Sequence, residues 1–225
     1  MYRHELKYMV NHGEAQVIKS RLKTICKPDQ YADENGRYTV TSLYFDDFCD
    51  SAINDNLSGS LKRKKFRIRI YNGKDSIIRL ERKVKNDNGG CKHSVILTKE
   101  QYLRILQGNY VLFKDSDDEV LSEFYNFSST RLLQPKVIVE YDREAFICSN
   151  GDVRITFDSN IRLPVGSKDI LNNTTISAQV IRPQETIMEV KYTGFLPSHI
   201  KKIIQNGKSN QQAFSKYVAC RTFIN

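Results

Sequence analysis

Charged side chains recur at every second position in several short segments of this chain, a spacing that places them on one face of a β-strand. The clearest segment is residues 63–71, with the sequence RKKFRIRIY. Its cationic face carries Arg63, Lys65, Arg67 and Arg69, and its apolar face carries Phe66, Ile68 and Ile70. Long cationic side chains suit phosphate oxygens, which arginine binds through two parallel N–H donors. The segment therefore predicts a strand that contributes to an anion-binding surface.

Other segments repeat this pattern and add a carboxylate to the cations. The shared faces hold Arg3, Glu5 and Lys7; Arg79, Glu81, Lys83 and Lys85; Arg154, Thr156 and Asp158; and Glu189 and Lys191. Like charges on adjacent strands repel, and packed cations lower lysine pKa values unless anions compensate. Glutamates among the cations fit a divalent ion bound with the ligand, because Mg²⁺ uses one or two carboxylates together with substrate phosphates. Alternation alone leaves open the simpler interpretation of solvated strand faces on an ordinary basic protein.

Composition agrees with a folded protein that has an anionic partner. The chain has 225 residues, of which 40% are hydrophobic, and a formal net charge of +9. The charge favours nucleic acid, an anionic membrane or a phosphate compound without choosing among them. We expect a cytosolic setting, since neither a bilayer-spanning apolar run nor a signal-peptide pattern occurs. The five scattered cysteines predict reduced thiols rather than a disulfide framework or a zinc site.

The remaining periodicities predict an α+β chain with a single domain over residues 1–225. We expect further strands at 38–45, 92–97 and 136–146, and helices at 11–26, 98–106, 116–133 and within 197–220. The pairs Thr98 with Gln101 and Ser116 with Glu119 are typical of capping boxes. Closing the antiparallel strands into a β-barrel would turn the charged faces into a lumen and the apolar faces toward outer helices.

Several weaker signals favour structural roles. The four histidines lack metal-ligand spacing, and Asp46-Asp47 is typical of a strand end entering a loop. Residues 206–209 (NGKS) lack the earlier glycine and the strand of a P-loop. The basic run 62–65 is a weak nucleic-acid signal, because alternation directs half of it to the apolar face.

The ordered series of motifs resembles the VTC domain, the polyphosphate polymerase domain of the vacuolar transporter chaperone complex. The VTC domain is one of the triphosphate tunnel metalloenzymes, which include the CYTH-type triphosphatases. The matching segments are ELKY (5–8), TSLYFD (41–46), RIRIY (67–71), LERK (80–83), YDR (141–143), RITFD (154–158), EVK (189–191) and FSKY (214–217). Ala213 departs from the pattern, which has a lysine three residues before the closing lysine. The chain is similar to a stand-alone prokaryotic-type member, without regulatory or membrane segments.

The resemblance implies site residues and a cofactor. Phosphates would contact Lys7, Arg67, Arg69, Lys83, Arg143, Arg154, Lys191 and Lys216. Second-rank positions are Glu5, Lys65, Glu81, Lys85, Lys92 and Ser215. Glu189 would hold Mn²⁺ or Mg²⁺. We expect Arg67, Arg69, Lys83, Arg143 and Arg154 to line one enclosed lumen.

The implied activity is transfer of the γ-phosphoryl group of ATP to a growing polyphosphate chain. The first alternative is hydrolysis of tripolyphosphate or a nucleoside triphosphate, with Glu5 or Glu81 as a possible base. The second is a polyphosphate-binding module without catalysis, although such a module has no need of Glu189. The expected partners are ATP or another triphosphate and inorganic polyphosphate, with a membrane protein as a further possible partner and nucleic acid disfavoured.

A polyanion site of this kind predicts that tripolyphosphate raises the melting temperature. A ligand that binds only the native state stabilises it by about 2.7 kcal/mol at 100 times its Kd. The effect should shrink at high salt, which screens the cations. Thermal melts with and without millimolar tripolyphosphate measure it, and an unchanged melting temperature would argue strongly against the site.

Overall fold

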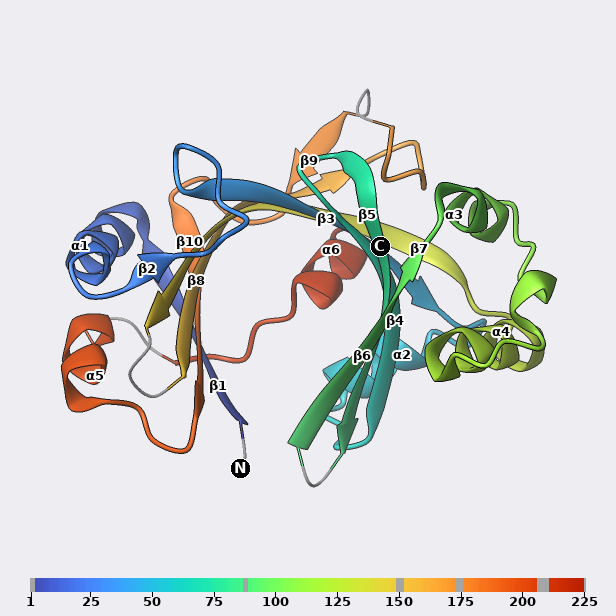
Figure 1. Ribbon diagram of the computed structural model, residues 1–225, viewed down its shortest axis with the longest axis horizontal. Coiled ribbons are helices and arrows are strands. Elements are labelled where there is room, and N and C mark those ends of the chain that lie inside the picture. Colours follow the sequence, from blue (N-terminus) through green and yellow to red (C-terminus); the bar gives the residue numbers. More distant parts are fainter. Residues whose placement is uncertain (1–2, 87–88, 149–151, 173–175, 206–210, 225) are drawn as a thin grey trace. The chain divides into compact units, whose positions relative to one another are not determined.

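The structure, a computed structural model, describes residues 3–86, 89–148, 152–172, 176–205 and 211–224. The strands are β1 (Arg3–Asn11), β2 (Lys27–Pro28), β3 (Arg37–Asp46), β4 (Arg63–Tyr71), β5 (Lys74–Asn86), β6 (Gly89–Leu97), β7 (Gln134–Cys148), β8 (Val153–Pro164), β9 (Ser177–Gln179) and β10 (Glu185–Thr193). The helices are α1 (His12–Lys23), α2 (Ser51–Leu57), α3 (Lys99–Leu106), the 3₁₀ turn η1 (Val111–Phe113), α4 (Glu119–Arg131), α5 (Ser198–Ile204) and α6 (Lys216–Ile224). The α+β prediction is confirmed (Figure 1).

Hydrogen-bonded ladders join the main strands in the order β1-β10-β8-β7-β3-β4-β5-β6, while β2 pairs with β7 and β9 pairs with β8. The ladders β1–β10, β10–β8, β2–β7, β3–β4, β4–β5 and β5–β6 are antiparallel, as predicted. Strands β1 and β6 end this order, and no ladder joins them in the described segments. Closure of a barrel requires a continuous ring of paired strands. Hydrogen bonds therefore do not close the sheet, and the expected closed barrel is not confirmed.

The chain forms two compact units. The first unit comprises residues 1–39, 141–161 and 179–215, and the second comprises 40–140, 162–178 and 216–225. Strands β3, β7, β8 and β9 each contribute residues to both units.

The first unit packs α1 and α5 on the apolar face of β1, β10 and β8 (Figure 1). Asn11 and Glu14 form a capping box at the start of α1, which is why the helix begins where the sequence predicts. The amphipathic pattern of residues 11–26 predicts a buried apolar face that includes Val17 and Ile25, but both residues are exposed. The buried face of α1 instead includes Lys19, whose Nζ lies 2.6 Å from Oε1 of Glu144.

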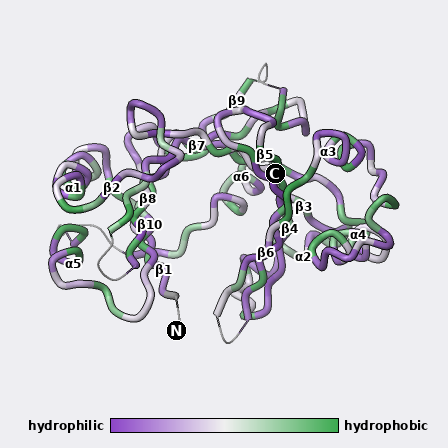
Figure 2. Tube along the Cα trace, viewed as in Figure 1, coloured by the Kyte–Doolittle hydropathy of each residue, from purple (hydrophilic) through white to green (hydrophobic). Residues whose placement is uncertain are grey.

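The second unit packs α3, η1 and α4 against the apolar face of β4 and β5. Phe66, Ile68 and Ile70 are at most 2% exposed, as their alternation predicts, and Figure 2 shows hydrophobic and hydrophilic residues following one another along the chain. Arg82 breaks the pattern: it lies on the apolar parity and contacts Glu119 and Glu123 of α4. Glu123 also pairs with Lys64, so the charge of this one residue of the basic run 62–65 is paired with a carboxylate of α4.

The helix boundaries of the second unit test both predicted capping boxes. Thr98 and Gln101 form theirs at the start of α3. The box predicted at Ser116 is wrong, because Asp118 caps α4 and accepts hydrogen bonds from the N–H groups of Val120 and Leu121. A carboxylate one residue before the helix satisfies the same free donors. The sequence predicts that the helices within 197–220 are interrupted near Asn206-Gly207, and this position and the NGKS segment lie outside the described residues.

The cysteine prediction is wrong for one pair. Cys26 and Cys148 form a disulfide whose Cα atoms are 4.5 Å apart, although 122 residues separate them in the chain. They meet because β2, which follows Cys26, pairs with the end of β7. Disulfides are typical of oxidising compartments, so the cytosolic setting stays a prediction. Among the described helices, none is both long enough and apolar enough for a bilayer crossing.

Candidate functional site

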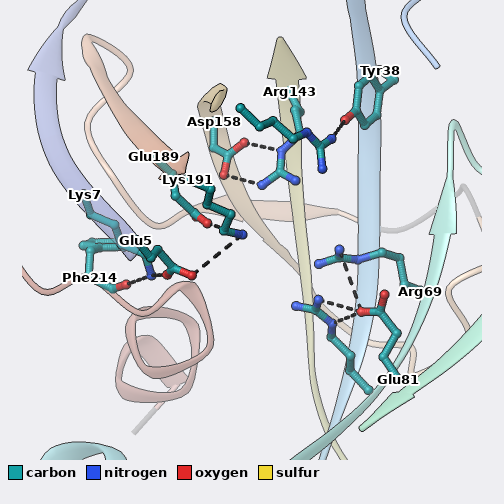
Figure 3. A network of polar contacts seen from close by, with 12 residues as sticks. Glu5, Lys7, Tyr38, Arg69, Glu81, Arg143, Asp158, Glu189, Lys191 and Phe214 are labelled. Carbon is teal, nitrogen blue, oxygen red and sulfur yellow. Dashed lines mark hydrogen bonds and ion pairs between the residues drawn. The ribbon is translucent and has the colours of Figure 1, made fainter. Parts of the chain in front are cut away.

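A buried carboxylate organises the cations of the second unit. Oε2 of Glu81 lies 2.6 Å from both Nε and Nη2 of Arg67 and 3.8 Å from Nη1 of Arg69 (Figure 3). Its Oε1 accepts a hydrogen bond of 2.8 Å from Nζ of Lys92. The register places Arg67 of β4 directly opposite Glu81 of β5. Glu81 of β5 thus faces three cations, two from β4 and one from β6.

The ionisation of Glu81 follows from these contacts. Burial opposes its charged form, but the positive charges of Arg67 and Arg69 and the hydrogen bond from Lys92 hold its pKa far below the usual range. Glu81 is therefore a permanent anion at neutral pH. Such a group neutralises its neighbours and is a poor proton acceptor.

Strand β3 orients the two arginines from the other side. Nη1 of Arg67 donates a hydrogen bond of 2.8 Å to the hydroxyl of Tyr44, and Nε of Arg69 donates one of 3.0 Å to Oγ of Ser42. Burial would raise the pKa of Tyr44, yet the charges of Arg67 and Arg69 lower it. Sequence reasoning missed the roles of Ser42 and Tyr44. Their two-residue spacing within TSLYFD is the signal that could have matched them to the two arginines.

More lysines continue this charged face toward the start of β4. The register pairs Lys65 with Lys83 and Lys83 with Lys92, so lysines lie opposite each other on three strands. Nζ of Lys65 lies 4.6 Å from the ring centroid of Tyr217, the second residue of α6. Lys83 and Lys85 are exposed, and Lys216 begins α6. The second unit thus brings together most of the residues that the motifs 67–71, 80–83 and 214–217 predict.

The first unit places the predicted metal ligand between two strands. The register aligns Lys7 of β1, Glu189 of β10 and Thr156 of β8 in one row. Nζ of Lys191 lies 2.5 Å from Oε1 of Glu189 and 3.8 Å from Oε2 of Glu5. Figure 3 shows these side chains together with Lys7.

Lys7 also holds the segment that precedes α6. Its Nζ lies 3.1 Å from Oε1 of Glu5 and donates a hydrogen bond of 2.9 Å to the carbonyl of Phe214. Ser215 follows directly in the chain, and Ala213 precedes it where the family pattern has a lysine. Ala213 is exposed. Lys7 therefore positions the segment that precedes α6.

Two arginines of the first unit are held by carboxylates that sequence reasoning did not assign. Arg143 binds the fully buried Asp158 through Nε at 2.6 Å and Nη2 at 2.8 Å. Burial opposes the charged form of Arg143, but Asp158 raises its pKa well above the ordinary value. The sequence signal that could have identified Asp158 is its position on the same strand face as Arg154.

Arg154 contacts a part of the chain with no motif. Its Nη2 lies 2.5 Å from Oδ2 of Asp29 and 3.1 Å from the hydroxyl of Tyr38. Burial raises the pKa of Tyr38 to about 12, so the hydroxyl keeps its proton. Asp29 follows β2 and had no sequence signal, because only the pairing of β2 with β7 brings it to Arg154.

The residues around Glu189 fit a hard divalent cation. Glu189 is buried, and Thr156 opposite it has a hydroxyl with no hydrogen-bond partner in the described segments. Mg²⁺ and Mn²⁺ take oxygen ligands and complete their shells with substrate phosphates and water. Within those segments, no group of three or more His, Cys, Asp or Glu residues has the geometry to hold a metal alone. A phosphate ligand would therefore have to supply part of the coordination.

Asp46 belongs to the fold. Its Oδ1 accepts from the N–H groups of Asp47 and Ala52, and its Oδ2 accepts from the N–H of Ile53 and the hydroxyl of Tyr217. These contacts join the end of β3 to α2 and α6. The interpretation of Asp46-Asp47 as a strand end is confirmed.

Burial decides between the two interpretations of the charged faces. Glu81 is 1% exposed, Arg69 7%, Glu189 7% and Asp158 0%. Groups on a solvated strand face would be mostly exposed. These charges are instead paired within each unit, so an ordinary solvated surface does not account for them. It stays a prediction that one lumen is lined by Arg67, Arg69, Lys83, Arg143 and Arg154.

The fold is an antiparallel, sheet-rich α+β architecture with cation-rich strand faces. The model of the VTC domain matches residues 2–225. The chain therefore belongs to the VTC domain family. A comparison with curated proteins finds no match.

Solved structures support the fold. One, described as an adenylyl cyclase candidate from Hippeastrum with a dominant triphosphatase activity, is 11% identical, with a TM-score of 0.60 over 99% of this chain and 96% of that one. Another, described as an adenylate cyclase candidate from Bacillus halodurans, is 14% identical, with a TM-score of 0.54 over 91% of this chain and 88% of that one. At these identities the likeness shows a shared fold.

The low pKa of Glu81 predicts a pH-dependent effect of Glu81→Gln. A carboxyl group whose pKa is lower in the folded state contributes stability that is complete above its unfolded value, near 4.3, and is lost as pH falls. The loss is about 1.4 kcal/mol per pH unit below that value. The deficit in unfolding free energy of Glu81→Gln should therefore shrink between pH 5 and pH 3. Urea unfolding at both values measures it, and a constant deficit would contradict the assigned ionisation.

Proposed function

We propose that the chain is a metal-dependent polyphosphate polymerase that transfers the γ-phosphoryl group of ATP to a phosphate chain. The observation that carries the proposal is the array of Arg67, Arg69 and Lys92 that the buried carboxylate of Glu81 holds. A fixed array of this kind binds phosphate oxygens without having to reorganise during the reaction. We include in the proposal the closed barrel that the alternating charged faces predict.

The cations have one chemical role in this reaction. Phosphoryl transfer spreads negative charge over the equatorial oxygens of the phosphorus, and catalysis depends on positioning and charge stabilisation. Arg67 and Arg69 supply planar donors that suit these oxygens. A bound Mn²⁺ or Mg²⁺ would polarise a phosphoryl oxygen when present, and Glu189 would hold it. Lys191 and Lys7 lie beside Glu189 and would orient the phosphates.

The state of the carboxylates supports transfer to phosphate over transfer to water. Hydrolysis is assisted by a base that accepts a proton from the attacking water. Glu81 cannot serve well, because both oxygens are engaged and its pKa is far below the usual range. Glu5 is paired with Lys7 and lies near Lys191. A phosphate acceptor is already anionic and needs no such base.

Hydrolysis of a triphosphate is the second candidate. It is favoured by the triphosphatase activity described for the Hippeastrum protein that shares the fold. A binding module without catalysis ranks third, since it needs no metal carboxylate. All three functions use the same cationic faces and differ in what happens to the terminal phosphate.

Product length separates these candidates. The protein is incubated with ATP and Mn²⁺, and the phosphate products are resolved on a gel. We expect a ladder of long chains. Orthophosphate alone would replace the polymerase with the hydrolase, and unchanged ATP would leave the binding module.

Glu189→Gln is expected to lower turnover of ATP at least about 100-fold, equivalent to about 2.7 kcal/mol of transition-state stabilisation. The amide keeps the shape of the side chain and removes the charge that holds the metal. Binding of the nucleotide, measured by calorimetry without metal, should persist because the cations remain. Glu185→Gln is the matched control, since it makes the same change four residues earlier on β10.

Arg67→Ala should behave in the opposite way and weaken nucleotide binding about tenfold or more, equivalent to about 1.4 kcal/mol. It removes a direct phosphate donor and leaves the metal ligand in place.

Turnover of Glu189→Gln close to that of the wild type would refute the assignment of the metal ligand.

A further inference from the structure

Thr156 carries a buried hydroxyl that the described part of the chain leaves unsatisfied. The residue is 5% exposed, and its hydroxyl has no hydrogen-bond partner among the described residues. An unsatisfied buried hydroxyl costs about 1–3 kcal/mol, and native proteins keep few such groups without a reason. The hydroxyl therefore indicates a missing binding partner.

The position of Thr156 shows which kind of partner it would meet. The register pairs Thr156 of β8 directly with Glu189 of β10. Side chains at directly opposed positions of antiparallel strands share one face and have Cβ atoms about 5 Å apart. A cation whose bonds to oxygen ligands are roughly 2 Å long can be bound by both side chains across this distance.

The neighbouring groups are already committed to other contacts. Both oxygens of Asp158 bind Arg143, and Nη2 of Arg154 binds Asp29. Oε1 of Glu189 lies 2.5 Å from Nζ of Lys191. A metal at Glu189 would compete with this ammonium group and would profit from a second, neutral oxygen ligand. Thr156 offers that oxygen without adding charge.

We propose that Oγ of Thr156 is a second protein ligand of the divalent cation that Glu189 holds. The inference rests on the metal site of the proposed function and adds a residue to it. Hard cations take oxygen ligands, and the threonine or serine hydroxyl of phosphate-binding loops is an established example of such a ligand for Mg²⁺. A site with one carboxylate and one hydroxyl leaves the remaining positions to phosphate oxygens and water.

The test is a titration with Mn²⁺ alone, in which electron paramagnetic resonance measures the free ion. Thr156→Val removes the hydroxyl at nearly constant shape and should raise the Kd for Mn²⁺ about tenfold, within the range that loss of a supporting ligand produces. Thr156→Ser keeps the hydroxyl and should stay within about twofold of the wild type. Thr186→Val is the matched control, because it removes a buried threonine hydroxyl from the opposite parity of β10.

Thermal stability separates a ligand from a structural residue. Thr156→Val replaces an unsatisfied hydroxyl with an apolar group, so its metal-free melting temperature should equal or exceed that of the wild type. A lower melting temperature together with unchanged Mn²⁺ affinity would show a structural role and overturn the proposal.

The remaining outcomes distinguish this inference from the proposed function. Suppose that Thr156→Val binds Mn²⁺ as tightly as the wild type does, while Glu189→Gln no longer binds it. The role of Thr156 is then overturned, and the assignment of Glu189 as the metal ligand stands. If Glu189→Gln also retains Mn²⁺, the metal assignment of the proposed function fails as well. The same titration is repeated with tripolyphosphate, and absence of Mn²⁺ binding by the wild type under both conditions refutes both. A Thr156→Val variant that loses tripolyphosphate affinity but keeps Mn²⁺ affinity assigns the hydroxyl to phosphate and also overturns the inference.

Discussion

Each charged strand face depends on a few buried carboxylates that offset the repulsion between neighbouring cations. Glu81 does this for Arg67, Arg69 and Lys92 in the second unit, and Asp158 does it for Arg143 in the first. Removing one partner of a buried ion pair leaves an uncompensated charge and costs about 3–5 kcal/mol. The carboxylates are therefore a condition for the cations to be buried at all.

The same pairing prepares the cations for an anionic ligand. Arginines held by a carboxylate, by Ser42 or by Tyr44 have lost much of their side-chain freedom before any ligand arrives. Less ordering then remains when a phosphate binds, which favours affinity. The pairs also keep a net positive charge, since Glu81 alone faces three cations. A polyanion can thus be attracted while the unliganded fold stays stable.

The apolar faces of these strands fix the orientation of the charged faces. Phe66, Ile68 and Ile70 pack under α3, η1 and α4, and this core fixes the orientation of the alternate, charged positions. Successive side chains of a strand point to opposite faces, so a shift of register by one residue would exchange core and site. The ion pairs of Arg82 with α4 add a polar contact to this otherwise apolar layer.

The local pattern of the sequence determined much of the fold and most of the candidate site. Strand β4 spans the predicted residues 63–71, and the EVK motif marked Glu189 and Lys191, which form an ion pair. Alternation predicts which residues share a strand face, because successive side chains of a strand point to opposite faces whatever strands lie beside it. The Thr98 cap was equally readable, since a capping box depends on four adjacent residues.

Only the tertiary structure decided which residues meet across the chain. Asp29 reaches Arg154, Cys26 reaches Cys148, and Tyr217 reaches Asp46, each pair more than 100 residues apart. Long-range pairing of this kind depends on strand register and on the packing of whole elements, which no local spacing encodes. The Thr156 hydroxyl, which has no hydrogen-bond partner among the described residues, is likewise visible only once β10 lies beside β8, because a threonine on a charged face has no distinguishing mark in the sequence. The sequence by itself therefore determined which residues share a face, and the folded chain decided which of them are paired, buried or left without a partner.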